Sequence, residues 1–149
     1  MTHLKQGDIA PIFSGADQNG NTISLKNFKG KKVVLYFYPK DSTPGCTAQA
    51  CDLRDNYNNL IKNGYVVIGV SGDSQKSHQK FIEKYSLPFP LIADTEKQII
   101  KEYGVWGPKK FMGKTFDGIH RTTFIISEEG KIEEIIDKVD TKEHTKQIL

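Results

Sequence analysis

The sequence predicts an α/β domain with a mixed central sheet, helices on its faces and a β-hairpin at its N-terminus. Two apolar runs, residues 33–38 (VVLYFY) and 65–71 (YVVIGVS), predict central strands because both of their faces are apolar. Residues 44–62 and 75–84 follow these runs and have the periodicity of helices. With 149 residues, the chain is expected to form one domain over 1–149.

The N-terminal hairpin is predicted from residues 16–25, ADQNGNTISL. Asn19 and Gly20 readily adopt the positive φ angles that a tight hairpin turn requires, so the turn is expected at this pair. The apolar strand 33–38 then leads into the helix predicted over residues 44–62.

The second half of the chain predicts shorter elements. Residues 87–94 (LPFPLIAD) favour a short extended piece bracketed by prolines, and residues 95–103 favour a helix. Residues 122–137 (TTFIISEEGKIEEIID) indicate a hairpin that turns at Glu129-Gly130, and residues 141–149 a final short helix. The predicted order is ββαβαβαββα, with no element expected between residues 104 and 121.

Charge and hydropathy exclude several classes of function. The chain has 21 basic and 18 acidic residues, a net charge of +3, and its lysines are scattered rather than clustered, which argues against nucleic-acid binding. The N-terminus, MTHLKQGDIAP, lacks the apolar core of a signal peptide, and no apolar run is long enough for a membrane span. We therefore expect a cytoplasmic protein, in which cysteines are more often reactive or idle than disulfide-bonded.

Both cysteines lie in one stretch, PKDSTPGCTAQAC, directly after the first apolar strand. Thr43 is a good helix N-cap and Pro44 then occupies the first helical position, so Cys46 falls at the third. The N–H groups and the positive dipole end of a helix favour an anion there, which predicts a nucleophilic thiolate at Cys46. Gly45 would let a substrate approach the backbone N–H groups, and Asp41 is expected to organise the loop.

The spacing of the cysteines predicts a site with two states. On an ideal helix Cys46 faces the protein body, while Cys51 is rotated about 140° away toward solvent. Their Cα atoms would be about 8.7 Å apart, whereas a disulfide needs less than about 7 Å. A bond between them therefore requires the first turn of the helix to unwind, which Gly45 makes easier.

A thiolate that becomes disulfide-bonded needs an oxidant, either another disulfide or a peroxide that first gives a sulfenic acid. Peroxide cleavage places negative charge on the departing oxygen, so a cation should stand nearby. Arg121 is the best candidate, because it opens the strand RTTFIIS. If that strand lies antiparallel to residues 33–38, its start meets their end beside Cys46.

Several motifs resemble the peroxiredoxins, and most of all the Q subgroup, the bacterioferritin comigratory proteins. The most specific are YPKDSTPGCTAQACDLRD and GKTFDGIHRTTFII, and the resemblance extends through GDIAPIF, GVSGDS, LPFPLIAD, YGVWG and EEGKI. The resemblance implies a thioredoxin-like fold, the reduction of hydroperoxides, no metal or organic cofactor, thioredoxin as the usual reductant, and a monomer.

Site residues follow from the same resemblance by motif position. Cys46 is similar to the peroxidatic cysteine and Cys51 to the resolving cysteine. Thr43 would orient the peroxide, Pro39 would shield the thiolate, and Arg121 would be the activating cation.

Some features remain open. Many peroxiredoxins have Glu three residues after the peroxidatic cysteine, but this chain has Gln49, which leaves the orientation of Arg121 in question. The four histidines have no metal-binding spacing and are expected at the surface. Two rival functions are a disulfide oxidoreductase, whose CxxC motif is absent, and a binding module that needs neither cysteine.

Overall fold

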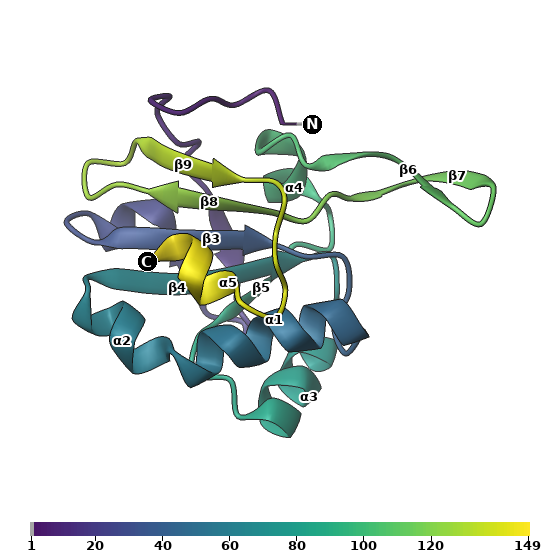
Figure 1. The fold of residues 1–149 in the computed structure, drawn as a ribbon, viewed down its shortest axis with the longest axis horizontal. Helices are drawn as coiled ribbons and strands as arrows, with labels where there is room; N and C mark the ends of the chain where they lie inside the picture. Colours follow the sequence, from purple (N-terminus) through teal and green to yellow (C-terminus); the bar gives the residue numbers. More distant parts are fainter. Residues whose placement is uncertain (1) are drawn as a thin grey trace.

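The computed structural model describes residues 2–149 and contains a five-stranded mixed sheet in the order β5-β4-β3-β8-β9 (Figure 1). The central strand, β3 (Lys32–Phe37), pairs in parallel with β4 (Tyr65–Ser71), which in turn pairs in parallel with β5 (Leu91–Ala93). On its other side β3 pairs antiparallel with β8 (Thr122–Ile126), and β8 with β9 (Ile132–Ile136). The predicted mixed sheet, with residues 33–38 at its centre, is confirmed.

The helices are α1 (Pro44–Asp55), α2 (Tyr57–Lys62), α3 (Gln75–Tyr85), α4 (Gln98–Glu102) and α5 (His144–Ile148). Apolar residues of α1, α2, α3 and α5 belong to one core and those of α4 to the other, so the sheet is covered on both faces. Over residues 2–149, no helix combines the length and the apolar character needed to cross a bilayer.

Strand β3 contributes to both cores because successive side chains of a strand point to opposite faces. One set packs toward α4 and the N-terminal segment, and the other toward the face that carries α1 and α3. The first set comprises Val33, Leu35 and Phe37, and the second Val34 and Tyr36, with Tyr38 just after the strand on the same side. This explains why residues 33–38 are uniformly apolar.

The N-terminal hairpin is formed by β1 (Ser14–Ala16) and β2 (Thr22–Ser24), as predicted. Its turn differs in detail: of the expected pair, Gly20 alone has a positive φ, at 81°. A short 3-10 helix, η1 (Leu25–Phe28), follows β2 and was not predicted.

A second antiparallel hairpin, β6 (Trp106–Phe111) and β7 (Lys114–Ile119), fills a region for which the sequence predicted no element. The hairpin extends away from the body of the molecule (Figure 1), and most of its residues are exposed. With little burial on either face, its strands lack the apolar alternation by which strands are recognised. The turn at Met112 and Gly113, where both residues have positive φ, is the signal that was missed.

The helix predicted over residues 44–62 is divided at Asn56, which separates α1 from α2. The Asn56 side chain donates to the Asp52 carbonyl at 2.8 Å, and its backbone N–H also reaches that carbonyl. A short polar side chain that bonds a carbonyl one turn back competes with regular helix geometry. The break leaves both cysteines within α1.

The C-terminal helix α5 is anchored to α1 and to the sheet. Asp52 of α1 accepts hydrogen bonds from the backbone N–H and the hydroxyl of Thr145, at 2.7 and 2.8 Å. The ring of His144 lies between Thr123 Oγ1 at 2.8 Å and Gln147 Oε1 at 2.7 Å, and the residue is fully buried. The expectation that all four histidines lie at the surface is therefore wrong for His144, because its ring fills a polar niche formed only by tertiary packing.

This burial predicts a pH dependence of stability. Removal from water lowers the pKa of His144 below its ordinary value. Unfolded chains take up a proton near about pH 6.5, whereas the folded protein does so only at lower pH, so stability present above that pH is lost as pH falls. We expect the free energy of unfolding to decrease between about pH 7 and pH 5, by at most about 1.4 kcal/mol per pH unit for this one proton.

Urea unfolding at several pH values, with His144→Asn as the matched variant, measures this contribution. The variant should show a shallower dependence on pH over the same range. The same pH dependence in both proteins would contradict the assignment to His144.

Candidate active site

The loop after β3 and the first turn of α1 have the predicted N-cap geometry. Thr43 has an extended backbone with φ −84° and ψ 154°, Pro44 is the first helical residue, and the Thr47 N–H donates to the Thr43 carbonyl at 2.8 Å. Cys46 therefore occupies the third helical position. The Thr43 hydroxyl itself donates to the Lys40 carbonyl at 2.8 Å, so it is held by the loop rather than by the helix.

Cys46 is buried, with 2% of its surface exposed, and Arg121 lies beside it. Arg121 Nη2 donates to Cys46 Sγ at 3.3 Å. The contact follows from the register of the sheet, in which Phe37 at the end of β3 pairs with Thr122 at the start of β8. The predicted adjacency of Arg121 and Cys46 is confirmed.

Glycine at position 45 leaves room for this arginine. A Cβ atom there would lie 3.2 Å from Arg121 Nη2, tighter than an ordinary contact. The close approach that Gly45 permits in this structure is therefore that of the Arg121 guanidinium.

Gln49 settles the orientation of the guanidinium, which the sequence had left in question. Arg121 Nη1 donates to Gln49 Oε1 at 2.7 Å, while Nη2 of the same group reaches Cys46. A neutral amide oxygen therefore orients the arginine without adding a negative charge. The other end of the amide, Gln49 Nε2, is buried and has no hydrogen-bond partner within residues 2–149.

Cys51 lies five positions further along α1 and is partly exposed, as predicted. Both cysteines of the described chain are free thiols. Because α1 is continuous from Pro44 to Asp55, it holds them in the helical geometry that does not allow a disulfide.

Pro39 is partly buried and lines a surface pocket beside the loop, together with Trp106, Lys109 and Phe116 of the β6–β7 hairpin. Lys109 was missed by sequence reasoning because its hairpin was not predicted. Burial lowers the pKa of Lys109, and repulsion from Arg121 lowers it further. Cys46 acts in the opposite direction and raises it. The hairpin therefore adds a second basic side chain, after Arg121, that interacts electrostatically with Cys46.

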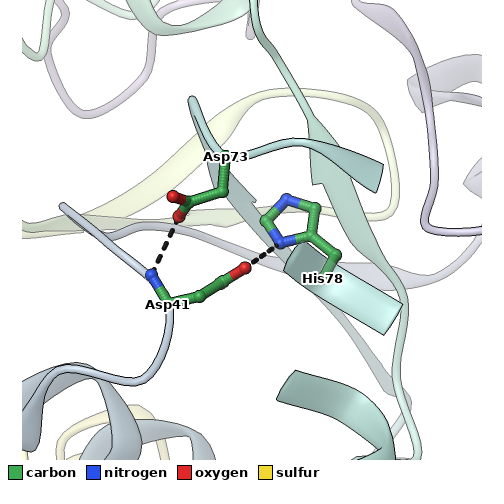
Figure 2. Close-up of side chains that lie close together, drawn as sticks. All are labelled: Asp41, Asp73 and His78. Carbon is green, nitrogen blue, oxygen red and sulfur yellow. Dashed lines mark hydrogen bonds and ion pairs between the residues drawn. The ribbon is translucent and has the colours of Figure 1, made fainter. Parts of the chain in front are cut away.

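A cluster of three titratable side chains lies beneath the loop (Figure 2). Asp41 comes from the loop, Asp73 follows β4, and His78 belongs to α3. His78 is fully buried, so the expectation of a surface histidine is wrong here too. Its partners are distant in sequence, and no local spacing reveals them.

The comparisons with known proteins agree with this geometry. The AhpC/TSA family profile matches residues 6–135. The chain is 50% identical to peroxiredoxin Bcp of Escherichia coli (strain K12), covering 100% of this chain and 96% of the relative. It is 46% identical to peroxiredoxin Bcp of Bacillus subtilis (strain 168), covering 98% and 93% of the two chains.

Solved structures give the same result. Xanthomonas campestris peroxiredoxin Q superposes with a TM-score of 0.87 at 33% identity, covering 95% of this chain and 93% of the other. A mutant of Xylella fastidiosa PrxQ superposes with a TM-score of 0.93 at 28% identity, covering 99% and 94%. The chain therefore belongs to the AhpC/TSA family, and within it to the peroxiredoxins of the Q (Bcp) group.

Proposed function

We propose that the chain is a thiol peroxidase in which the Cys46 thiolate attacks hydrogen peroxide or an organic hydroperoxide. The sulfur donates an electron pair to one peroxide oxygen, an S–O bond forms and the O–O bond breaks. Cys46 becomes a sulfenic acid, and the departing oxygen takes up a proton to leave as water or an alcohol. The observation that carries this proposal is the Arg121 guanidinium, 3.3 Å from Cys46 Sγ at the N-terminus of α1.

The surrounding residues have roles that follow from their positions. Arg121 and the N–H groups of the first turn supply positive charge where the departing oxygen becomes negative. Thr43, held in the loop by Lys40, would orient the peroxide. Gly45 leaves room for the Arg121 guanidinium beside the thiolate, and Pro39 would shield the thiolate from solvent.

Cys51 completes the proposed cycle. Its thiol attacks the Cys46 sulfenic acid, water leaves, and a Cys46–Cys51 disulfide forms. This step requires the first turns of α1 to unwind, because the folded helix holds the two sulfurs apart. A dithiol protein of the thioredoxin type then reduces the disulfide and is itself oxidised.

Replacing Cys51 by serine should separate the two steps. We expect the variant to consume one equivalent of peroxide and to accumulate a sulfenic acid at Cys46, which dimedone would trap. Steady-state turnover with thioredoxin should fall by roughly tenfold or more, because the disulfide that thioredoxin exchanges with cannot form.

Mass spectrometry of the trapped species, with the wild type as the control, measures this. The oxidised wild type should contain a Cys46–Cys51 disulfide and should show faster amide exchange over residues 43–52. An oxidised wild type without that disulfide would contradict the resolving role of Cys51. A reduced protein that cleaves insulin disulfides but leaves peroxide intact would favour a disulfide oxidoreductase instead.

We further propose that the protein works as a cytoplasmic monomer without nucleic-acid or membrane partners. Two free thiols fit a reducing compartment, and a net charge of +3 over 149 residues is too small for strong polyanion binding. Sedimentation at assay concentrations tests the oligomeric state, and a stable dimer would contradict this part of the proposal.

A further inference from the structure

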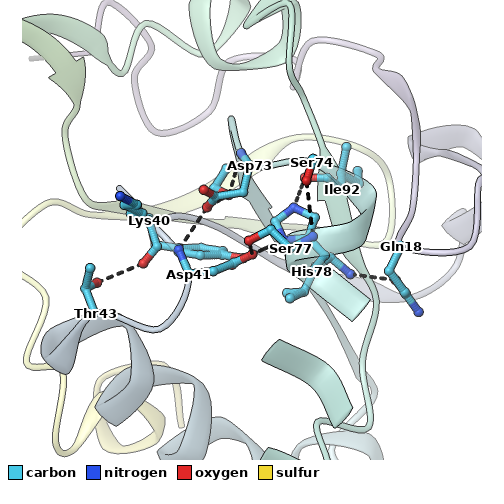
Figure 3. A network of polar contacts seen from close by, with 12 residues as sticks. Gln18, Lys40, Asp41, Thr43, Asp73, Ser74, Ser77, His78 and Ile92 are labelled. Carbon is cyan, nitrogen blue, oxygen red and sulfur yellow. Dashed lines mark hydrogen bonds and ion pairs between the residues drawn. The ribbon is translucent and has the colours of Figure 1, made fainter. Parts of the chain in front are cut away.

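The loop between β3 and α1 is anchored at Asp41 by a buried polar network (Figure 3). The Tyr38 hydroxyl donates to Asp41 Oδ1 at 2.6 Å, and the Ser77 hydroxyl donates to Oδ2 at 2.8 Å. His78 Nδ1 lies 2.7 Å from the same Oδ2 atom. The side chain of Asp41 is therefore fixed by Tyr38, just after β3, on one side and by α3 on the other.

The backbone of Asp41 is held as well. Its N–H donates to Asp73 Oδ2 at 2.8 Å, and the Ser71 hydroxyl, at the end of β4, donates to the same oxygen at 2.7 Å. The next residue, Ser42, has a φ of 62°, in the left-handed region that serine rarely adopts. The hydrogen bonds on Asp41 hold this conformation, and Thr43 then begins α1.

The hydrogen-bond partners of His78 indicate how many of its two ring nitrogens carry a proton. Its Nε2 lies 3.0 Å from the Ile92 carbonyl oxygen, which can only accept. Its Nδ1 faces the Asp41 carboxyl group, whose two oxygens already accept hydrogen bonds from Tyr38 and Ser77. Both ring nitrogens therefore face acceptors, and both are satisfied only if each carries a proton.

No other group around His78 donates a hydrogen bond that would satisfy a ring nitrogen without its own proton. The Tyr38 hydroxyl is 3.5 Å from Nδ1, and burial raises the pKa of Tyr38 well above its ordinary value, so its proton stays on the phenol and is donated to Asp41. Asp73 is the remaining charged group, and it can only accept hydrogen bonds. One of its carboxylate oxygens lies within 4.8 Å of an Asp41 oxygen and a His78 ring nitrogen. The imidazolium is the one cation in this cluster of Asp41, Asp73 and His78.

His144 provides a contrast within the same chain. Its Nδ1 faces the Gln147 side-chain oxygen, but its Nε2 faces the hydroxyl of Thr123, which can donate as well as accept. A neutral His144 ring therefore satisfies both partners, whereas a neutral His78 ring does not.

We propose that His78 is a positioning residue for the peroxide reaction. As an imidazolium paired with Asp41, it holds the loop 39–43, and thereby Thr43, in place ahead of Cys46, where the peroxide binds. The inference rests on the proposed role of Cys46. Because the anchor holds residues that precede the turn that must unwind, His78 acts on the peroxide step and much less on disulfide formation.

Nitrogen-15 NMR of the reduced wild type tests the proton count directly. At about pH 7 we expect protons on both ring nitrogens of His78 and on only one of those of His144. A His78 ring with a single proton under these conditions would overturn the proposal. This readout does not depend on activity, so it stands even if the function proposed for Cys46 is wrong.

Single-turnover kinetics test the positioning role. His78→Leu should lower the second-order rate constant for peroxide by about 10- to 100-fold, since small misplacements of reacting groups cost this much. His78→Asn retains an N–H group near the position of Nδ1 and should restore most of that rate. Disulfide formation, measured separately, should change by less than about threefold in both variants.

An unchanged peroxide rate in His78→Leu, or an equal loss in both steps, would overturn the proposal. Failure of His78→Asn to recover rate relative to His78→Leu would also count against it. If the leucine variant does not fold, the comparison of His78→Asn with the wild type and the NMR proton count still decide the matter. A Cys46→Ser variant that still consumed peroxide would instead refute the proposed function, whatever the NMR result.

Discussion

Replacing Cys46 by serine is expected to abolish peroxide reduction, with a loss of roughly 10⁴-fold or more, because removing a covalent nucleophile typically costs at least this much. The serine hydroxyl fits the same buried position but is not ionised at neutral pH, and its oxygen cannot take the place of sulfur as the atom that is oxidised. Peroxide consumption by the reduced protein, followed both in a single turnover and with a thioredoxin system, measures the loss.

Cys51→Ser is the matched control for this substitution. It makes the same exchange of sulfur for oxygen five residues further along α1, and it should retain the first turnover. Circular dichroism of both variants establishes that the fold is intact. A Cys46→Ser protein that kept more than about a tenth of the wild-type rate would rule out Cys46 as the nucleophile and would favour a binding module.

Arg121→Gln should lower the rate of the peroxide step by about 10²- to 10³-fold, the usual effect of removing a donor from a site where negative charge develops. The guanidinium contacts both Cys46 Sγ and Gln49 Oε1, and a glutamine supplies neither its charge nor its two-pronged geometry. Arg121→Lys keeps the charge but not the fork, so we expect an intermediate loss of about tenfold. Stopped-flow measurement of the second-order rate constant with peroxide distinguishes the three proteins.

Arg54 offers a control of the same chemical type. It lies on α1, but its side chain donates to the Tyr85 carbonyl and pairs with Asp55. Arg54→Gln removes the same charge from the helix that carries Cys46, without removing a contact to its sulfur. An equal loss in Arg54→Gln and Arg121→Gln would show that net charge, rather than the contact with sulfur, controls the rate.

Much of the site could be predicted because its determinants are local or follow the sheet. The helix N-terminus at Thr43 and Pro44 is encoded by residue types that fix backbone conformation. The position of Arg121 followed from one assumption, that the strand 122–126 lies antiparallel to β3, and the register bears this out. Burial of Cys46 and partial exposure of Cys51 followed from helical periodicity alone.

What could not be predicted depends on distances between remote segments. The β6–β7 hairpin is largely exposed, so its sequence has no pattern of burial to reveal it. His78 and His144 are buried because Asp41, Ile92 and Thr123, from other elements, complete their hydrogen bonds. A histidine without such partners would belong at the surface, and local sequence cannot distinguish the two cases.

The anchors at Asp41 and Asp52 have a kinetic consequence for the proposed cycle. Asp41 is tied to α3 and to Tyr38, and Asp52 to α5, so the segment between them carries both thiols with its two ends fixed. Melting and re-forming an isolated helix of this length takes on the order of a microsecond, whereas enzymes commonly turn over about 10 times per second. Even if packing of Cys46, Ala50 and Leu53 in the core slows this melting about 10⁴-fold, the rearrangement keeps pace with turnover while the sheet beneath it stays folded.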